Sequence, residues 1–214
     1  MKNRLKHPLS FVFLALLLGL SFSTEVLAEA LQAPQQIIQV VSSKVQQKLK
    51  DKAFTKNFLE VTKFVNSVIN PHTDFDKIAP LVLGKHWKDA TTEEQARFTH
   101  EFQTLIVRTY SRAFIEYTDW TLRFMPLEMT NEDTKVIVKT EILQPGLQPV
   151  EVSYRMFSKN GEWKVYDIMI EGVSLVTNYR STFSNEIQTK GSLSAVIDGL
   201  VKRNADALSA RDTP

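Results

Sequence analysis

The carboxylate with the clearest chemical potential is Asp167, which lies in a run with the alternating pattern of a β-strand. Val165 and Met169 stand two positions to either side, so all three side chains face the same way in a strand. Burial among apolar neighbours would raise the pKa of this carboxyl group and suit it to act as a general base. If this carboxylate acted on a substrate, the step would be proton abstraction by a general base.

No second group completes a catalytic machinery around this carboxylate. The four histidines are dispersed: His7 is in the N-terminal leader, His72 and His86 are in predicted turns, and His100 faces away from the apolar stripe of its helix. None has metal-ligand spacing with another, and the chain has no glycine-rich phosphate loop and no Ser-His-Asp order. We therefore expect no catalytic residue, no metal site and no cofactor, and an enzyme based on Asp167 remains the alternative.

The first residues have the pattern of a secretory signal peptide. Three basic residues occur among the first six, and residues 9–20 are almost wholly apolar, which is too short for a comfortable membrane span of about 20 residues. Small residues then fit a cleavage site after Ala28, with Ala30 as the second choice. An uncleaved anchor is the alternative. We expect a cleaved leader at 1–28 and a single domain at 29–214.

Composition restricts what the mature chain can be. It contains no cysteine, so it cannot carry a lipid anchor at a cleavage-site cysteine, and its core must hold without disulfides. Removing residues 1–28 leaves 23 basic and 23 acidic side chains. This balance argues against nucleic acid as a partner and against adsorption to anionic membrane by bulk charge. A bacterial periplasm fits these features.

The hydrophobic period changes twice along the chain, from helical to alternating and back. Helical spacing dominates up to residue 118, and no glycine or proline interrupts the longest segment. We expect helices over 34–50, 54–70, a short segment ending at Gly84, and 92–118; strands over 120–127, 134–143, 149–157 and 162–170; and helices from Gly172 to about 187 and from 191 onward, with a frayed tail from Asn204.

Four consecutive strands between helical segments predict an α+β domain with an antiparallel meander. Asn160-Gly161 is a strong hairpin signal between the last two strands, because both residue types tolerate positive φ. The final strand is apolar on both faces, with Trp163, Val165 and Met169 on one and Tyr166, Ile168 and Ile170 on the other. Helices can cover one face of such a strand, and either a bound ligand or the C-terminal helices must cover the other.

Three blocks carry a resemblance to a known family. The first runs from Asp-Phe-Asp at 74–76 to Leu-Gly-Lys-His-Trp at 83–87, the second is the helical segment 94–110, and the third is the strand-to-helix run Trp163–Phe183. Together, behind a signal peptide, they resemble the MlaC family of periplasmic phospholipid carriers, which are also called toluene-tolerance auxiliary proteins. The likeness covers roughly residues 34–204.

The resemblance implies an NTF2-like cone, in which a curved antiparallel sheet of four or slightly more strands and several helices enclose an apolar cavity. It also implies a soluble periplasmic carrier that moves phospholipid between an outer-membrane lipoprotein–porin complex and an inner-membrane ABC transporter complex with its substrate-binding membrane subunit, and so maintains outer-membrane lipid asymmetry. We expect a monomer. The rival interpretations are an NTF2-like periplasmic enzyme that uses Asp167, and an adaptor without a ligand.

For a lipid cavity we select apolar and aromatic side chains from the long helix, the strands and the final strand-to-helix run. These are Phe102, Ile106, Tyr110, Val138, Val152, Tyr154, Val165, Val173, Leu175, Val176, Tyr179 and Phe183. A fully packed core is the alternative for the same residues. Arg180 is the head-group candidate, since a guanidinium matches phosphate oxygens, and its alternative role is an ion pair with Glu171 or Asp167.

Overall fold

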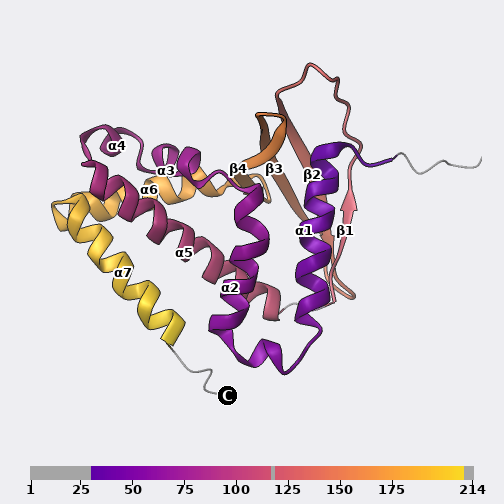
Figure 1. Cartoon of the computed structure of the whole chain (residues 1–214), viewed down its shortest axis with the longest axis horizontal. Helices are drawn as coiled ribbons and strands as arrows, with labels where there is room; N and C mark the ends of the chain where they lie inside the picture. The colour runs from indigo at the N-terminus through magenta and orange to yellow at the C-terminus, as the bar shows by residue number, and fades with distance from the viewer. Residues whose placement is uncertain (1–29, 117–118, 210–214) are drawn as a thin grey trace, which may run out of the picture. The chain divides into compact units, whose positions relative to one another are not determined.

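The computed structural model describes residues 30–116 and 119–209, and from Leu31 onward these belong to one compact unit. The predicted leader and its cleavage after Ala28 lie outside the described residues. Helices come first, five strands follow, and two helices end the chain (Figure 1). The elements are α1 (Ala33–Leu49), η1 (Phe54–Lys56), α2 (Phe58–Ile69), η2 (Asn70–His72), α3 (Phe75–Leu83), α4 (Lys85–Asp89), α5 (Thr92–Glu116), β1 (Thr121–Phe124), β2 (Lys135–Leu143), β3 (Val150–Lys159), β4 (Glu162–Ile170), β5 (Val173–Ser174), α6 (Leu175–Lys190) and α7 (Leu193–Ser209).

Local capping signals explain where several helices begin. The Thr91 backbone N–H donates to the Glu94 carboxylate at 2.9 Å, and the Glu94 N–H donates back to the Thr91 hydroxyl at 3.2 Å, which forms a capping box at the start of α5. Asp74 accepts from the Lys77 N–H at 2.9 Å and so begins α3. Gly84 ends α3 at a positive φ of 55°, as its position in the sequence indicates.

The sheet is an antiparallel meander in the order β1-β2-β3-β4-β5, so the α+β class and the antiparallel sheet are confirmed. Asn160 and Gly161 both have positive φ and make the predicted hairpin turn between β3 and β4. Glu171 and Gly172 have φ of 49° and 76° and make a second two-residue turn. The expectation that the chain passes from Gly172 directly into a helix is therefore wrong in detail, because the short β5 pairs with β4 first.

A β-bulge changes the face assignment of β4. Arg155 pairs with Asp167, but Met156 pairs with Val165, which leaves Tyr166 without a partner on β3. The extra residue reverses the alternation of faces along the strand. Val165 and Ile168 therefore belong to the same apolar cluster, although strict alternation would put them on opposite faces. The assignment of residues to the two faces that strict alternation predicts is thus wrong. Tyr166 turns to the other side and packs against the helical residues.

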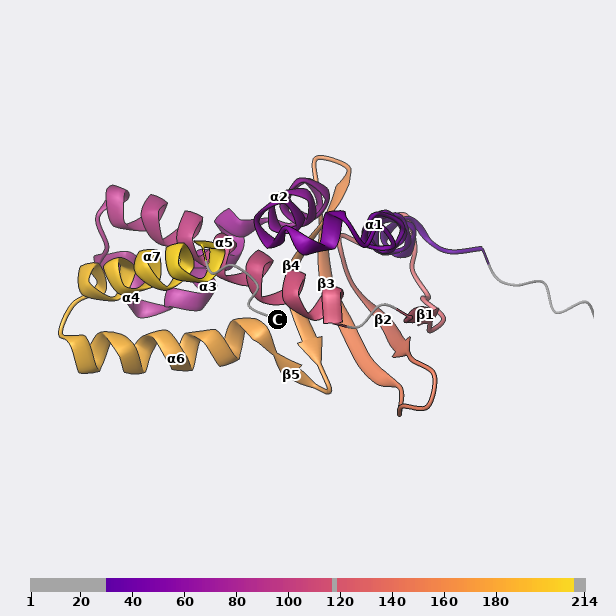
Figure 2. The ribbon, with the colours of Figure 1, turned by 90° about the horizontal axis from the view of Figure 1, so that it is seen from below.

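One region of the fold is a solid helical core. It is formed by buried side chains of α3, α5, α6 and α7, and we call this cluster the helical core: Phe75, Ile78, Ala79, Val82, Leu83, Phe98, Phe102, Val176, Phe183, Ile187, Val196, Ile197 and Leu200. Phe98 packs edge-on against Phe183 with ring centroids 5.0 Å apart. Figure 2 shows the chain turning back from α6 into α7 in this region; α7 packs against α5 and α6, and α6 also contacts α3 and β4.

Three element boundaries differ from expectation. The second helix begins at Phe58 after a 3₁₀ turn, because Asn57 rather than a residue near Phe54 caps it. Strand β1 spans only Thr121–Phe124. The tail is not frayed at Asn204, because α7 continues to Ser209. The Asn204 side chain is buried, accepts from the Arg108 guanidinium at 2.8 Å and donates to the Glu101 carbonyl at 2.9 Å.

Two properties of the described ranges bear on the function. None of their helices combines the length and hydrophobicity needed to cross a bilayer. Nor do these ranges hold any group of three or more histidine, cysteine, aspartate or glutamate side chains arranged to bind a metal ion.

Candidate functional site

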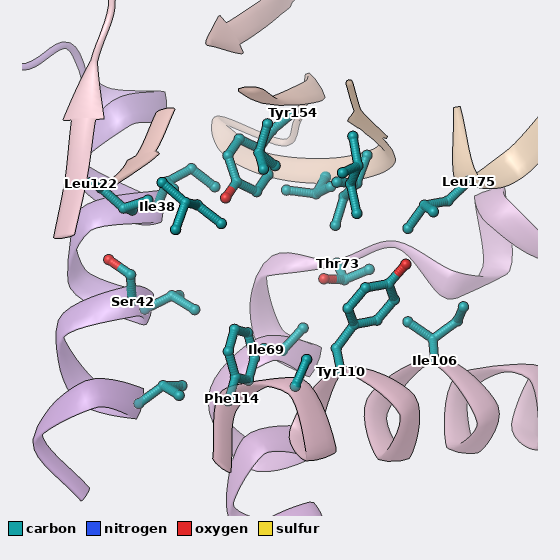
Figure 3. Close-up of a pocket in the computed structure, with 18 of the residues that line it drawn as sticks. Ile38, Ser42, Ile69, Thr73, Ile106, Tyr110, Phe114, Leu122, Tyr154 and Leu175 are labelled. Carbon is teal, nitrogen blue, oxygen red and sulfur yellow. The ribbon is translucent and has the colours of Figure 1, made fainter. Parts of the chain in front are cut away.

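A cavity of about 620 Å³ lies between the inner face of the sheet and helices α1, α2, α3 and α5 (Figure 3). Its volume is in the range of roughly 300–1,000 Å³ that ligand pockets occupy. The wall is almost entirely hydrocarbon, with aliphatic side chains from the sheet facing aliphatic and aromatic side chains from the helices. A surface of this kind is suited to enclose an apolar ligand rather than to carry out bond chemistry.

Most elements of the domain contribute to the wall. The lining residues are, from the helices and the turns between them, Ile37, Ile38, Val41, Ser42, Val45, Ile69, His72, Thr73, Phe75, Ile78, Phe102, Ile106, Val107, Tyr110, Ala113 and Phe114; from the sheet and its loops, Trp120, Leu122, Ile142, Gln144, Leu147, Gln148, Val150, Val152, Tyr154, Val165, Asp167, Ile168 and Ile170; and from the start of α6, Leu175 and Val176.

Eight of the residues selected from the sequence line this cavity, on both of its walls. They are Phe102, Ile106, Tyr110, Val152, Tyr154, Val165, Leu175 and Val176. The structure brings these side chains together from α5, β3, β4 and α6. Their contact with a lipid is a proposal, because a cavity wall shows where a ligand fits and not which ligand enters.

Four selected residues lie outside the cavity wall. Val138 is fully buried among Ile38 and Met156, beneath the cavity surface. Tyr179 and Phe183 belong to the aromatic packing of the helical region, where the Tyr179 ring meets the Phe102 ring edge-on at 5.3 Å. Val173 is at the other extreme, 59% exposed in the two-residue strand β5. The helical period that suggested these positions identifies burial but does not distinguish a packed core from a hollow.

Arg180 is placed neither at the cavity wall nor in the alternative ion pair. Its Nε donates to the backbone carbonyl of Leu81 at 2.7 Å, so the side chain joins α6 to the end of α3. The partner of Asp167 is instead Arg155, at 3.2 Å across the β3–β4 pair. Sequence spacing could not reveal this, because the bulge at Tyr166 sets which residues of β4 face β3 residues.

The Asp167 carboxylate is buried and fully engaged by donors from three elements. Oδ2 accepts from the Ser174 hydroxyl at 2.7 Å and from the Arg155 guanidinium at 3.2 Å, and Oδ1 accepts from the Val176 N–H at 3.2 Å. The carboxylate therefore ties the turn into α6 to the sheet. An acceptor whose lone pairs are occupied in this way is suited to a structural role rather than to proton abstraction.

Sequence reasoning missed the contribution of the N-terminal helix. Ile37, Ile38 and Val41 of α1 form one side of the cavity, and Leu122 of β1 and Leu147 of the β2–β3 loop complete it. The apolar stripe of α1 was visible as residues four apart. A stripe shows only that one face is covered, and nothing in the sequence says that this helix packs against the sheet, beside β1 and β2 (Figure 1).

The cavity opens to solvent at the β2–β3 loop. Leu147 lines the wall and is nevertheless 60% exposed, and the neighbouring Gln148 is also both lining and exposed. Gln144 on the other arm of the same loop adds a second amide. The wall is thus apolar inside and polar at this rim, which is the arrangement that an amphipathic ligand needs.

The titratable groups inside the cavity are held in neutral forms. Burial raises the pKa of the Tyr154 hydroxyl to about 12, and burial together with the nearby Tyr179 raises that of Tyr110 to about 12. The pKa of His72 is lowered by burial and by the charges of Lys164 and Lys44. At neutral pH the wall therefore presents uncharged groups, apart from the Asp167 carboxylate that Arg155 already pairs.

The fold and the cavity define a class of protein: an α+β binding protein whose sheet and helices enclose an apolar cavity. The chain belongs to the MlaC family, because the family model for the MlaC protein matches residues 39–202. This match confirms the family that the three sequence blocks indicate.

Similar proteins extend this result. The chain is 24% identical over 200 residues to the toluene tolerance protein ttg2D of Pseudomonas putida, covering 92% of this chain and 93% of that one. It is 26% identical over 115 residues to the intermembrane phospholipid transport system binding protein MlaC of Haemophilus influenzae, covering 52% and 54%. A solved phospholipid-binding protein from Ralstonia solanacearum, in complex with a phospholipid, matches with a TM-score of 0.74 and 28% identity over 82% of this chain and 99% of that one.

Proposed function

We propose that this protein is a periplasmic phospholipid carrier that holds the acyl chains in the cavity between its sheet and α1, α2 and α5. The observation that carries the proposal is the cavity of about 620 Å³ with a hydrocarbon wall and a polar rim. The relatives support it, since one is named as a phospholipid transport binding protein and another was solved with a phospholipid.

The energetics of burial favour a carrier over an exchanger that works through water. Each methylene group removed from water contributes about 0.8 kcal/mol, so two acyl chains of about 30 carbons in total would gain on the order of 20 kcal/mol before ordering costs. A ligand held this strongly leaves very slowly into solvent. Loading and release therefore require partners that offer the lipid a continuous apolar path.

The partners that we propose follow from family membership. They are an outer-membrane lipoprotein–porin complex on one side and an inner-membrane ABC transporter complex with its substrate-binding membrane subunit on the other, with maintenance of outer-membrane lipid asymmetry as the result. The apolar run of residues 9–20 and the cleavage-site pattern that ends at Ala28 support export to the periplasm and cleavage after Ala28. The carrier itself acts as a monomer and supplies no catalytic residue.

Lipid extraction tests the proposal directly. The full chain is expressed with its leader, recovered from the periplasm without detergent, and analysed by intact mass and by mass spectrometry of extracted lipid. We expect a mature chain that begins at Glu29 and phospholipid in near-stoichiometric amount. Protein that is folded but free of phospholipid, and that takes none up from vesicles, would contradict the carrier function. A substrate turnover that Asp167→Asn abolishes would favour the enzyme instead.

A further inference from the structure

The polar groups of the cavity wall differ in whether the protein already satisfies them. The Ser42 hydroxyl donates to the Gln39 carbonyl of its own helix at 3.0 Å. The Tyr154 hydroxyl is hydrogen-bonded to the Thr140 side chain, which in turn donates to the Val152 carbonyl at 3.0 Å. These two hydroxyls need nothing from a ligand.

The Tyr110 hydroxyl is different. No hydrogen bond joins it to any of the described residues, although its ring is packed into the α5 wall of the cavity. Figure 3 shows the hydroxyl at the far end of the ring, directed into the open space and away from α5. Thr73 has a lining hydroxyl that is likewise unpaired within the described ranges, but its side chain is short, so Tyr110 reaches further into the space.

An unpaired phenol in an apolar space limits what fills that space. A buried donor without an acceptor costs free energy, and pure hydrocarbon offers no acceptor. Burial holds the hydroxyl in its protonated form at any physiological pH, so it can only be matched by a ligand oxygen or by water. Of the groups in a phospholipid that are close to the acyl chains, the ester carbonyl oxygen is an acceptor without a charge.

We propose that Tyr110 donates a hydrogen bond to an acyl ester carbonyl of the bound lipid, so that the cavity encloses the ester region as well as the hydrocarbon chains. This inference rests on the proposed phospholipid-carrier function and sharpens it. The site then distinguishes ester-linked from ether-linked lipids, because an ether of the same chain length has no carbonyl oxygen at the position that the phenol reaches.

A competition between two lipids tests the assignment. The detergent-free protein is incubated with vesicles of equimolar diester and diether phosphatidylcholine with identical chain lengths, recovered, and its bound lipid is quantified by mass spectrometry. The net contribution of one hydrogen bond corresponds to an enrichment of the diester of about fivefold in the wild type. Tyr110→Phe is expected to bind both lipids with a ratio near one.

Tyr166→Phe is the matched control. It removes the same hydroxyl from a tyrosine that packs against the helical core and does not line the cavity, so the enrichment should remain at the wild-type value. A wild-type ratio of one, or a wild-type ratio retained by Tyr110→Phe, would overturn the role of Tyr110 while leaving the carrier function intact. A wild type that takes up neither lipid would overturn the carrier function itself and this inference with it.

Discussion

The helical core and the region between the sheet and α1 contain similar apolar residues but differ in packing: the first is filled and the second is hollow. In the helical core, Phe98, Phe102 and Phe183 interlock with centroid distances of 5.0–6.0 Å and leave no space. Between the sheet and α1, aliphatic side chains from facing walls fail to meet and enclose about 620 Å³. Four residues belong to both regions and mark the boundary between them: Phe75, Ile78, Phe102 and Val176. Hydrophobicity therefore determines burial in both halves, while the spacing of the backbone elements determines which half is hollow.

Enlarging one alanine in each region should give the largest contrast. Ala79 of α3 is fully buried in the helical core, so Ala79→Phe overpacks it and should lower the free energy of unfolding by about 3 kcal/mol or more. Ala113 of α5 lines the cavity, so the ring in Ala113→Phe enters open space and should leave stability within about 1 kcal/mol of the wild type. Urea unfolding measures both changes.

The same pair separates the fold from the ligand. Ala113→Phe is expected to lose most of its bound phospholipid because the ring occupies the space of an acyl chain. If Ala113→Phe were as unstable as Ala79→Phe, the region would not be hollow in solution.

Truncating one leucine in each region should give the next contrast. Leu200 is fully buried in the helical core, and Leu200→Ala should cost about 3 kcal/mol because it leaves a void among fixed neighbours. Leu175 already borders empty space, so Leu175→Ala removes fewer contacts and should cost about 1 kcal/mol or less in lipid-free protein. Equal losses in the two variants would show that the two regions are equally packed.

The smallest effect concerns the joint between the halves. The Asp74 carboxylate caps α3 and accepts from Lys159 of β3 at 2.9 Å. The backbone N–H of Asp74 donates to the Val165 carbonyl of β4 at 3.0 Å. Burial alone would raise the pKa of Asp74, but the hydrogen bonds from Lys159 and the Lys77 N–H and the nearby positive charges outweigh burial and lower it.

Because the folded pKa is below the ordinary value near 3.9, the charged group stabilises the fold above about pH 5, and this contribution is lost as the pH falls through the folded pKa. Asp74→Asn keeps a capping side chain but should lose about 1–2 kcal/mol at pH 7, and its difference from the wild type should shrink toward acid pH. Asp76→Asn, on the same helical turn but exposed, serves as the control. A pH-independent difference for Asp74→Asn would contradict the assignment.

Local chemistry is what the sequence predicted well. The Asn160–Gly161 turn and the helix end at Gly84 depend on neighbouring residues only, and each is present. The tail illustrates the opposite case: Asn204 is a polar residue near the end of the chain, and its burial depends on Arg108, which is distant in sequence.

The candidate site was predictable in part for the same reason. Ile106, Val152 and Leu175 stand on the apolar faces of their elements, and those faces line the cavity. Val138 and Phe183 have the same local pattern and are packed solid. Whether an apolar face lines a cavity or a packed core depends on the distance between elements, which the hydrophobic period does not indicate. It also depends on the bulge at Tyr166, which no glycine, proline or other turn residue marks in the sequence.

The unpaired Tyr166 in β4 also has an evolutionary consequence. It allows Val165, Ile168 and Ile170 to face the cavity. This effect depends on the presence of one extra residue in the strand and not on which apolar residues surround it. The cavity wall can thus accept many apolar replacements over time. Deletion of a single codon here would instead restore strict alternation and turn part of the wall to the outside, so length, more than composition, is the quantity that selection must preserve in this strand.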